Sequence, residues 1–149
     1  MTRIDLDPGP SKLFQEIGGR DTLVRVHHFL YEKIYAHPWL KQFFTQSPRA
    51  HQEAQQTDFM TRVLGGPRVY SGRLPRDAHP HLFITDEVFD IRHDLLRQAL
   101  KDAQVRPDIA ETWLRLDEGF RAMLVKKSVD DCFGRYRTEE IIAPPRPSE

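Results

Sequence analysis

The sequence predicts an all-α fold in a single domain, and three observations support that prediction. Apolar residues recur at spacings of three and four in most segments of the 149-residue chain. No segment shows the alternation of apolar and polar residues that is typical of a half-buried strand. Glycine and proline stand between the periodic segments, where helices end. The length suits one domain with a buried core, and we expect five or six helices.

The first part of the chain predicts two amphipathic helices that meet at a sharp corner. A short helix over residues 13–17 ends at Gly18-Gly19, a pair typical of helix stops. Asp21 is placed to cap the next helix, which ends near Pro38. Tyr31 lies beside its apolar stripe, which consists of Leu23, Val26, Leu30 and Ile34.

The middle of the chain predicts one longer helix between two irregular segments. Large apolar residues crowd positions 39–44, which is too dense for an exposed loop. A helix follows over about 49–64 and is polar until its last turns. Gly65-Gly66-Pro67 ends this helix, and a loop rich in turn residues follows as far as Asp77.

Two further helices are predicted after residue 85. Asp86 is placed to cap the first of them, which carries apolar residues from Phe89 to Leu100. Pro107 interrupts the chain and suits the first turn of the last helix. Apolar residues continue at helical period as far as Val129, so we expect one long final helix.

Composition and the two ends set limits on location and partners. Lysine plus arginine balances aspartate plus glutamate at 22 each, so no overall field recruits nucleic acid or an anionic membrane. Residues 1–12 contain no apolar segment like that of a signal peptide, and no apolar run approaches the roughly 20 residues of a spanning helix. The single cysteine, Cys132, cannot form an internal disulfide, so we expect a cytoplasmic protein. The domain is expected at 12–135, after a flexible arm at 1–11. A tail at 136–149 follows, disordered at its end.

Several common chemistries fit the sequence poorly. Gly65-Gly66 follows a helix and has no Lys-Ser/Thr after it, so it is not a phosphate-binding loop. His79, His81 and His93 offer only a weak zinc site, because no cysteine pair or His-Glu-x-x-His motif accompanies them. Cys132 has no identifiable base, so the sequence does not support a nucleophilic dyad.

A haem pocket fits more of the chain. It needs a strong axial ligand for iron, hydrogen-bond donors near the bound gas, and hydrocarbon around both. Because Pro80 disfavours helical geometry at His79, we expect that imidazole at the start of a short helical turn, free to point inward. Gln52 and Gln56 project from one helix face, and with Tyr31 they offer one O–H and two NH₂ groups.

These residues belong to an ordered set of motifs that resembles the truncated haemoglobins. The set consists of Gly18-Gly19, Phe29-Leu30-Tyr31, Phe43-Phe44, Leu64-Gly65-Gly66-Pro67 and Ala78-His79 with Leu82 and Ile84-Thr85. The resemblance covers roughly residues 13–130 and is closest to the group with a glutamine-rich distal face. It implies a two-over-two helical sandwich around haem b, with His79 as the proximal iron ligand and Tyr31, Gln52 and Gln56 as the distal polar residues. The other residues expected around the cofactor are Phe44, Phe59, Met60, Tyr70, Arg76, Leu82, Ile84, Phe89 and Arg92.

Three features depart from the family pattern or leave an alternative. His81 lies two residues after His79 and competes with it as the iron ligand. Pro80, directly after His79, is uncommon in the family and can re-aim that imidazole. Arg92 stands on the apolar stripe of its helix, where the family places an apolar or aromatic residue. Its side chain reaches a haem propionate or the distal ligand, or extends along its methylenes to solvent.

The resemblance leaves several functions open. The first is reversible binding of O₂, NO or CO, as an oxygen carrier or scavenger. The second is a haem enzyme that acts as an NO dioxygenase, peroxidase or nitrite reductase and depends on a separate reductase. The third, a haem-free helical interaction module, requires an exposed His79. Neither a nucleic acid nor a membrane is an expected partner.

Overall fold

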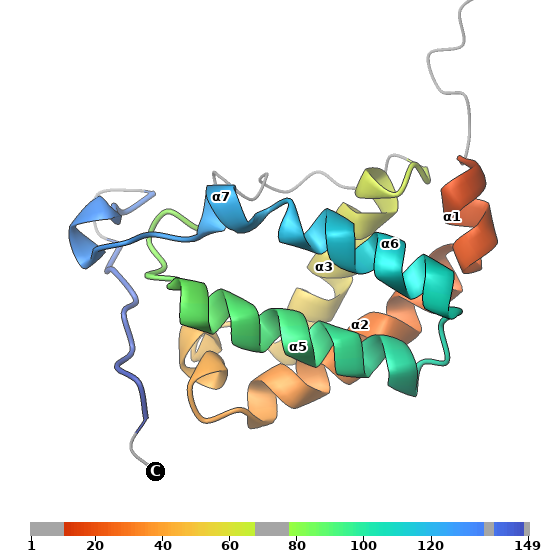
Figure 1. The fold of residues 1–149 in the computed structure, drawn as a ribbon. Helices are drawn as coiled ribbons and strands as arrows, with labels where there is room; N and C mark the ends of the chain where they lie inside the picture. Colours follow the sequence, from red (N-terminus) through yellow and green to blue (C-terminus); the bar gives the residue numbers. More distant parts are fainter. Residues whose placement is uncertain (1–10, 68–77, 136–138, 148–149) are drawn as a thin grey trace, which may run out of the picture.

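The computed structural model describes residues 11–67, 78–135 and 139–147, which form helices joined by turns (Figure 1). The helices are α1 (Lys12–Ile17), α2 (Gly19–Ala36), α3 (Arg49–Val63), α5 (Asp86–Asp102), α6 (Pro107–Glu118) and α7 (Arg121–Leu124), with 3₁₀ helices η1 (Leu40–Phe44) and η2 (Val129–Asp131). In these ranges, extended pairing is limited to two isolated bridges, Leu82 with Ile142 and Ile84 with Val125. The all-α prediction is confirmed. None of the described helices is both long and apolar enough to span a membrane.

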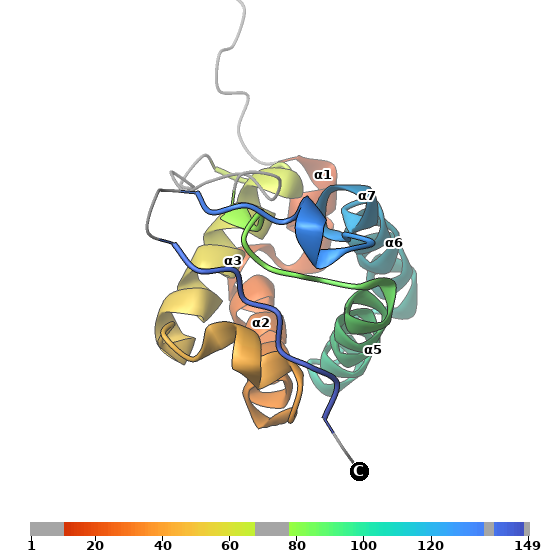
Figure 2. The same ribbon diagram turned by 90° about the vertical axis from the view of Figure 1, so that its left-hand side faces the viewer.

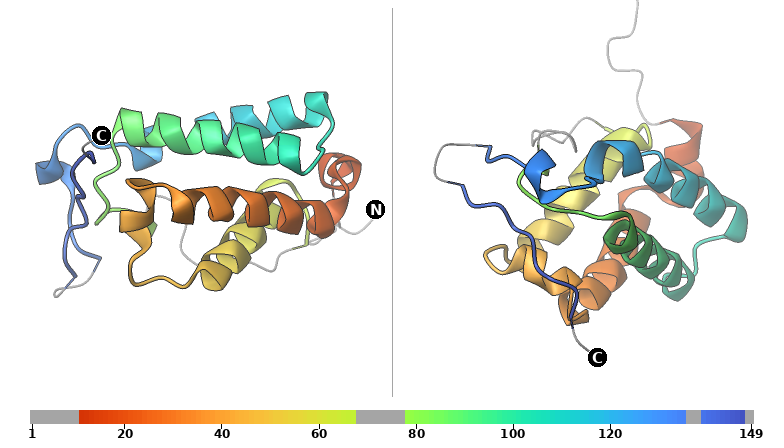
Figure 3. Two further views of the ribbon diagram at one scale, coloured as in Figure 1. Left: turned by 90° about the horizontal axis from the view of Figure 1, so that it is seen from below. Right: turned by 60° about the vertical axis from the view of Figure 1, so that its left-hand side comes forward.

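The helices form two layers, as the predicted two-over-two sandwich requires. Figure 3 (left) shows α2 and α3 in one layer and α5 and α6 in the other. α2 packs against both α3 and α5 and so occupies the centre of the fold. Its predicted stripe is buried, with exposed fractions of 1% or less for Leu23, Val26, Leu30 and Ile34. Since burial of each such side chain contributes about 1.5–3 kcal/mol, this stripe anchors both layers.

Glycine makes the corner between α1 and α2. Gly18 has φ 102°, and its N–H bonds back to carbonyls of α1, which ends that helix as predicted. A Cβ at Gly18 would lie 2.4 Å from Thr22 Oγ1, so a larger residue would be both strained and crowded. α2 begins at Gly19, so Asp21 lies in its first turn and the prediction that Asp21 is the cap was wrong.

The second half differs from the sequence prediction at two helix ends. Thr85, not Asp86, caps α5, because its side chain accepts a hydrogen bond from Val88 N at 3.1 Å. Pro107 begins α6 as predicted. The expected long final helix is instead interrupted: α6 ends at Glu118, and the chain is extended at Val125. Of the apolar residues after this break, Leu124 is buried, whereas Met123 and Val129 are 38% and 45% exposed.

The C-terminal segment also differs from expectation. The sequence predicts no fixed structure after residue 140, whereas residues 139–147 lie beside residues 81–84 and cross between the two layers (Figure 2). Phe83 N donates to Ile142 O at 2.9 Å, and Ile142 N donates to the carbonyl of His81 at 2.8 Å. Trp39 Nε1 donates to Pro144 O at 3.1 Å. Backbone pairing and the indole therefore order a proline-rich segment whose composition alone indicates disorder.

Candidate functional site

A cavity of about 950 Å³ lies between the two layers of helices. Its walls come from α2, η1, α3, residues 78–84, α5, the end of α6 and the C-terminal segment. The volume is within the usual range of roughly 300–1,000 Å³ for ligand pockets. The large apolar side chains around it are Ile34, Leu40, Phe43, Phe44, Phe59, Leu82, Ile84, Val88, Phe89, Phe120, Leu124 and Ile142. The cavity can therefore accept a large, mainly hydrophobic group.

One part of the wall carries polar side chains that make no hydrogen bond with the described residues. Tyr31 comes from α2, and Gln52, Gln55 and Gln56 come from α3. In the part of the chain that the structure describes, none of these four side chains makes a hydrogen bond. Burial raises the pKa of Tyr31 to about 12, so its hydroxyl stays protonated at neutral pH and remains a donor. These groups are available to a polar ligand inside the cavity.

A second part of the wall carries both candidate imidazoles. His79 and His81 line the cavity from the segment between Ala78 and α5. Leu82 N donates to His79 O at 3.0 Å, which forms the turn expected around Pro80. His81 is buried, and its Nδ1 lies 3.8 Å from Glu139 Oε1. The sequence did not predict this carboxylate, because residue 139 falls in the expected tail.

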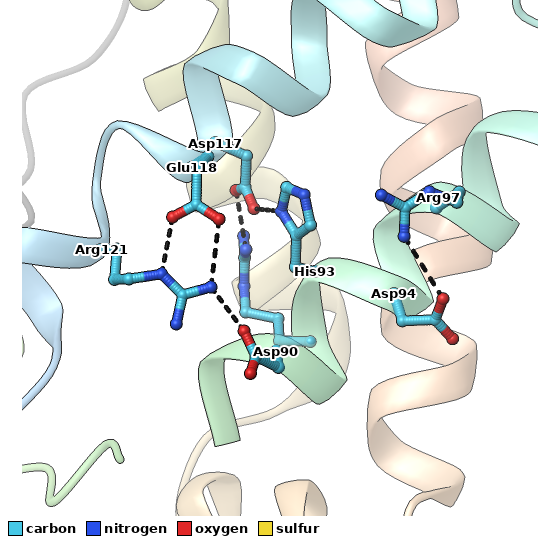
Figure 4. A network of polar contacts seen from close by, with 8 residues as sticks. Asp90, His93, Asp94, Arg97, Asp117, Glu118 and Arg121 are labelled. Atoms are coloured by element: carbon cyan, nitrogen blue, oxygen red, sulfur yellow. Dashed lines mark hydrogen bonds and ion pairs between the residues drawn. The ribbon is translucent and has the colours of Figure 1, made fainter. Parts of the chain in front are cut away.

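Arg92 points into the fold, where it meets a buried carboxylate. Its guanidinium donates to Asp117 Oδ1 at 2.7 Å, and both residues line the cavity. His93 Nδ1 lies 2.8 Å from the other oxygen, Asp117 Oδ2, as Figure 4 shows for the α5 histidine and the α6 carboxylate. Burial opposes ionisation of both groups, but the Arg92 guanidinium lowers the pKa of Asp117, and the Asp117 carboxylate raises the pKa of Arg92. The alternative that Arg92 extends to solvent is therefore wrong.

A second arginine secures the outer side of α5 near this network. Arg121 donates to Glu118 Oε2 at 2.6 Å and to Asp90 Oδ1 at 2.5 Å (Figure 4). Its guanidinium carbon lies 4.4 Å from the ring centroid of Phe89, a cavity residue. These contacts hold the end of α6 against α5 and so fix the wall from which Arg92 and Asp117 project.

Most of the apolar residues predicted from the sequence line the cavity, namely Phe44, Phe59, Leu82, Ile84 and Phe89. Met60 does not. It is 2% exposed and packs in the main core, because the next position on α3 lies about 100° further around the helix than Phe59. Tyr70 and Arg76 lie outside the described residues.

Sequence reasoning missed the charged part of the wall. Asp117 follows Trp113 by one helical turn, so it stands on the buried stripe of α6. A carboxylate on one buried stripe and an arginine on another were the available signal for the Arg92–Asp117 pair. Arg135 and Glu139 gave no comparable signal. Within the described ranges no group of three metal-ligating side chains forms, so the zinc alternative gains no support.

Comparisons with known proteins give one consistent result. Residues 12–124 match the family model described as bacterial-like globin. The chain is 29% identical to the group 1 truncated haemoglobin of Tetrahymena pyriformis over 118 residues, which cover 79% of this chain and 98% of that one. The Fe(III) crystal structure of truncated haemoglobin from T. pyriformis superposes with a TM-score of 0.69, at 29% identity, over 77% of this chain and 98% of that one.

Other solved structures extend the comparison. The T. pyriformis protein has also been crystallised as variants in which one tyrosine or either of two glutamines is replaced. The group II truncated haemoglobin of Bacillus anthracis gives a TM-score of 0.71 at 24% identity over 78% of this chain and 92% of that one. At that identity the similarity supports the fold.

Proposed function

Since the chain belongs to the bacterial-like globin family, we propose that it binds diatomic gases reversibly at haem iron, as an oxygen carrier or scavenger. Haem is the cofactor of the truncated haemoglobins and of this chain. We take O₂ as the main ligand and NO and CO as alternatives. The observation that carries this proposal is the composition of the cavity wall, which combines hydrocarbon, imidazole and donors that make no hydrogen bond with the described residues.

The residues present fit the haem group. Apolar side chains surround a volume of about 950 Å³, which suits a flat hydrophobic macrocycle. Three imidazoles, those of His51, His79 and His81, line that volume, and imidazole nitrogen is a common axial ligand of haem iron. Arg92 and Arg135 also line the cavity and are suitable partners for carboxylate groups such as propionates.

We assign His79, and not His81, as the iron ligand. His79 follows Ala78 in the family-like motif and occupies the turn that frees its side chain from a regular helix. The Nδ1 atom of His81 lies 3.8 Å from the Glu139 carboxylate. His81 is therefore better placed for an electrostatic contact with Glu139.

Tyr31, Gln52 and Gln56 are proposed as the donors to the bound gas. In the T. pyriformis chain, the tyrosine and the two glutamines replaced in the crystallised variants have the same spacing as these three residues. Their side chains make no hydrogen bonds within the described part of this chain. Gln55 lines the same wall and is a further candidate donor.

When bound, haem iron supplies the coordination position at which a gas molecule binds and gains partial negative charge. Neutral O–H and N–H donors stabilise such charge without carrying a charge of their own. Tyr31 is suited to this role because burial keeps its hydroxyl protonated. We therefore expect slow release of O₂.

The visible absorption spectrum of the protein supplied with haem tests the ligand assignment. We expect a strong Soret band in the wild type and in His81→Ala, and a weakened, shifted band in His79→Ala that added imidazole restores. Loss of the band only in His81→Ala would transfer the ligand role to that residue. A wild type without a Soret band would refute the proposed function.

Stopped-flow measurement of O₂ release tests the distal assignment. Tyr31→Phe removes one donor worth about 0.5–1.5 kcal/mol, so release should become roughly two- to tenfold faster. Tyr35→Phe is the matched control, because the Tyr35 hydroxyl donates to Ser47 O at 2.8 Å and its ring does not line the cavity. Equal release rates in the two variants would contradict the role of Tyr31.

The carrier role is separable from enzymatic turnover by mixing the oxygenated protein with NO. A carrier should consume NO no faster when a reductase system is present. Rapid, repeated conversion of NO to nitrate in the presence of a reductase would instead support the dioxygenase alternative.

A further inference from the structure

The segment that carries His79 and His81 is held by residues that follow residue 124. Each carbonyl from 78 to 82, and that of Ile84, accepts a hydrogen bond from a residue between 126 and 142. The donors, in order along the segment, are Arg135 Nη1, Lys126 Nζ, Phe133 N, Ile142 N, Lys126 Nζ and Lys126 N, at 2.5–3.2 Å. Residues 79–84 lie in neither a regular helix nor a regular strand, so these bonds fix their backbone.

Lys126 is at the centre of this arrangement. Its ammonium donates to His79 O at 2.5 Å and to Leu82 O at 2.7 Å, so it joins the two ends of the His79 turn. Its backbone N donates to Ile84 O at 2.8 Å. Lys126 forms no ion pair with the described residues, so the contacts of its ammonium there are the hydrogen bonds to these two carbonyls.

The C-terminal segment completes the enclosure. Arg135 forms an ion pair with Glu139 at 2.5 Å, and Glu139 lies close to His81. Trp39 Nε1 bonds to the carbonyl of Pro144, which fixes the segment to the other layer. Glu139 and Ile142 also line the cavity, so the segment is part of the wall that it supports.

This support lies outside the part of the chain that matches the family model, which ends at residue 124. The matched part supplies the helices, the imidazoles and the distal donors. The bonds to the carbonyls of 78–82 and 84 come from residues after it. The histidine segment of this chain thus depends on an addition to the matched domain.

We propose that residues 125–135 and 139–142, here called the clamp, position His79 toward the haem iron and slow the loss of haem. The proposal rests on the proposed function, because it takes His79 as the iron ligand. Its basis is that a ligand's orientation is set by its backbone and by the groups around it. With the clamp bonds in place, the His79 turn has one backbone conformation. Without them, the turn is free to reorient the imidazole.

Two substitutions remove clamp bonds without touching a histidine. Lys126→Met keeps the methylene stem and deletes the ammonium, and Lys126→Arg restores a cationic donor. Ile142→Pro deletes the N–H that bonds to His81 O. The matched controls are Lys127→Met and Ile141→Pro, since residues 127 and 141 are exposed and donate no hydrogen bond within the described chain.

The full-length proteins would be loaded with haem and compared by three measurements. These are helix content by circular dichroism, the rate of haem transfer to excess apomyoglobin, and the iron–histidine stretching band in the resonance Raman spectrum. We expect Lys126→Met and Ile142→Pro to lose haem about tenfold faster or more and to shift or broaden that band, because outer-shell partners typically change metal affinity by 10- to 100-fold. Lys126→Arg and both controls should behave as the wild type.

Haem loss at the wild-type rate and an unshifted band in both Lys126→Met and Ile142→Pro would overturn the clamp. If Lys126→Met loses helix content, Ile142→Pro decides the question, because it leaves the lysine in place. Failure of the proposed function gives a different result, namely a wild type that binds no haem or a His79→Ala variant with an unchanged spectrum.

Discussion

The buried ion pair between Arg92 and Asp117 should make the two residues strongly coupled in their contribution to stability. The Asp117 side chain is buried (7% exposed) and the Arg92 side chain is half-buried (22% exposed), so loss of one partner should cost up to the roughly 3–5 kcal/mol that is typical of buried pairs. Asp117→Leu leaves the guanidinium without its carboxylate. Arg92→Met should cost less, because Asp117 keeps the contact from His93 at 2.8 Å. The double variant removes both charges and should cost less than the sum of the single changes by about 2 kcal/mol.

Urea denaturation followed by circular dichroism measures the free energy of unfolding for the four proteins of this cycle. Arg97→Met is the matched control, because the Arg97–Asp94 pair is 50% and 58% exposed and should contribute no more than about 1 kcal/mol. Single effects that add to within about 0.5 kcal/mol in the double variant would refute the reasoning. They would mean that solvent screens the pair despite its burial.

Three further predictions concern the scaffold and the distal wall. Burial lowers the pKa of His27 to about 3. Between pH 6.5 and 3, His27 therefore binds a proton in the unfolded chain but not in the folded chain. The free energy of unfolding should fall by about 1.4 kcal/mol for each unit by which the pH decreases in this range. His27→Gln should flatten that slope in urea midpoints, and an unchanged slope would assign it to other groups. Gly18→Ala should destabilise the folded protein by about 1–3 kcal/mol in the same assay, because φ at Gly18 is 102° and the added Cβ meets Thr22. An unchanged free energy of unfolding would contradict strain at this corner. Gln56→Leu should speed O₂ release by about two- to tenfold, and an unchanged rate would remove Gln56 from the distal donors.

The helical framework follows from local sequence signals. The stripe of α2, the stop at Gly18 and the start of α6 at Pro107 each depend on residues within one or two turns of one another. Such signals are readable because helix geometry repeats every 3.6 residues and chain reversal needs particular backbone angles. The errors at the caps of α2 and α5 have the same origin. In each case two residues within one turn of each other offered a capping side chain or the needed backbone angles, and the backbone geometry decided which residue is the cap.

The candidate site was predictable to the extent that it resembles a known family. Tyr31, Gln52, Gln56 and His79 all line one cavity, as the ordered motifs implied. Periodicity alone favoured a solvated face for the two glutamines, because the first turns of α3 are polar. The polarity of one helix does not show whether its polar face meets solvent or a cavity between two layers of helices.

The sequence by itself determined the all-α class, the buried stripes, the helix stops and the order of the family-like motifs, because each is encoded in residues close together along the chain. Only the tertiary structure decided that Arg92 meets Asp117, that residues after 124 hold the His79 turn, and that the proline-rich segment is ordered. These features join residues 25 to 105 positions apart, and the packing of the two layers decides which residues meet. Burial also sets the strength of the Arg92–Asp117 ion pair, since water would screen the same two charges at the surface.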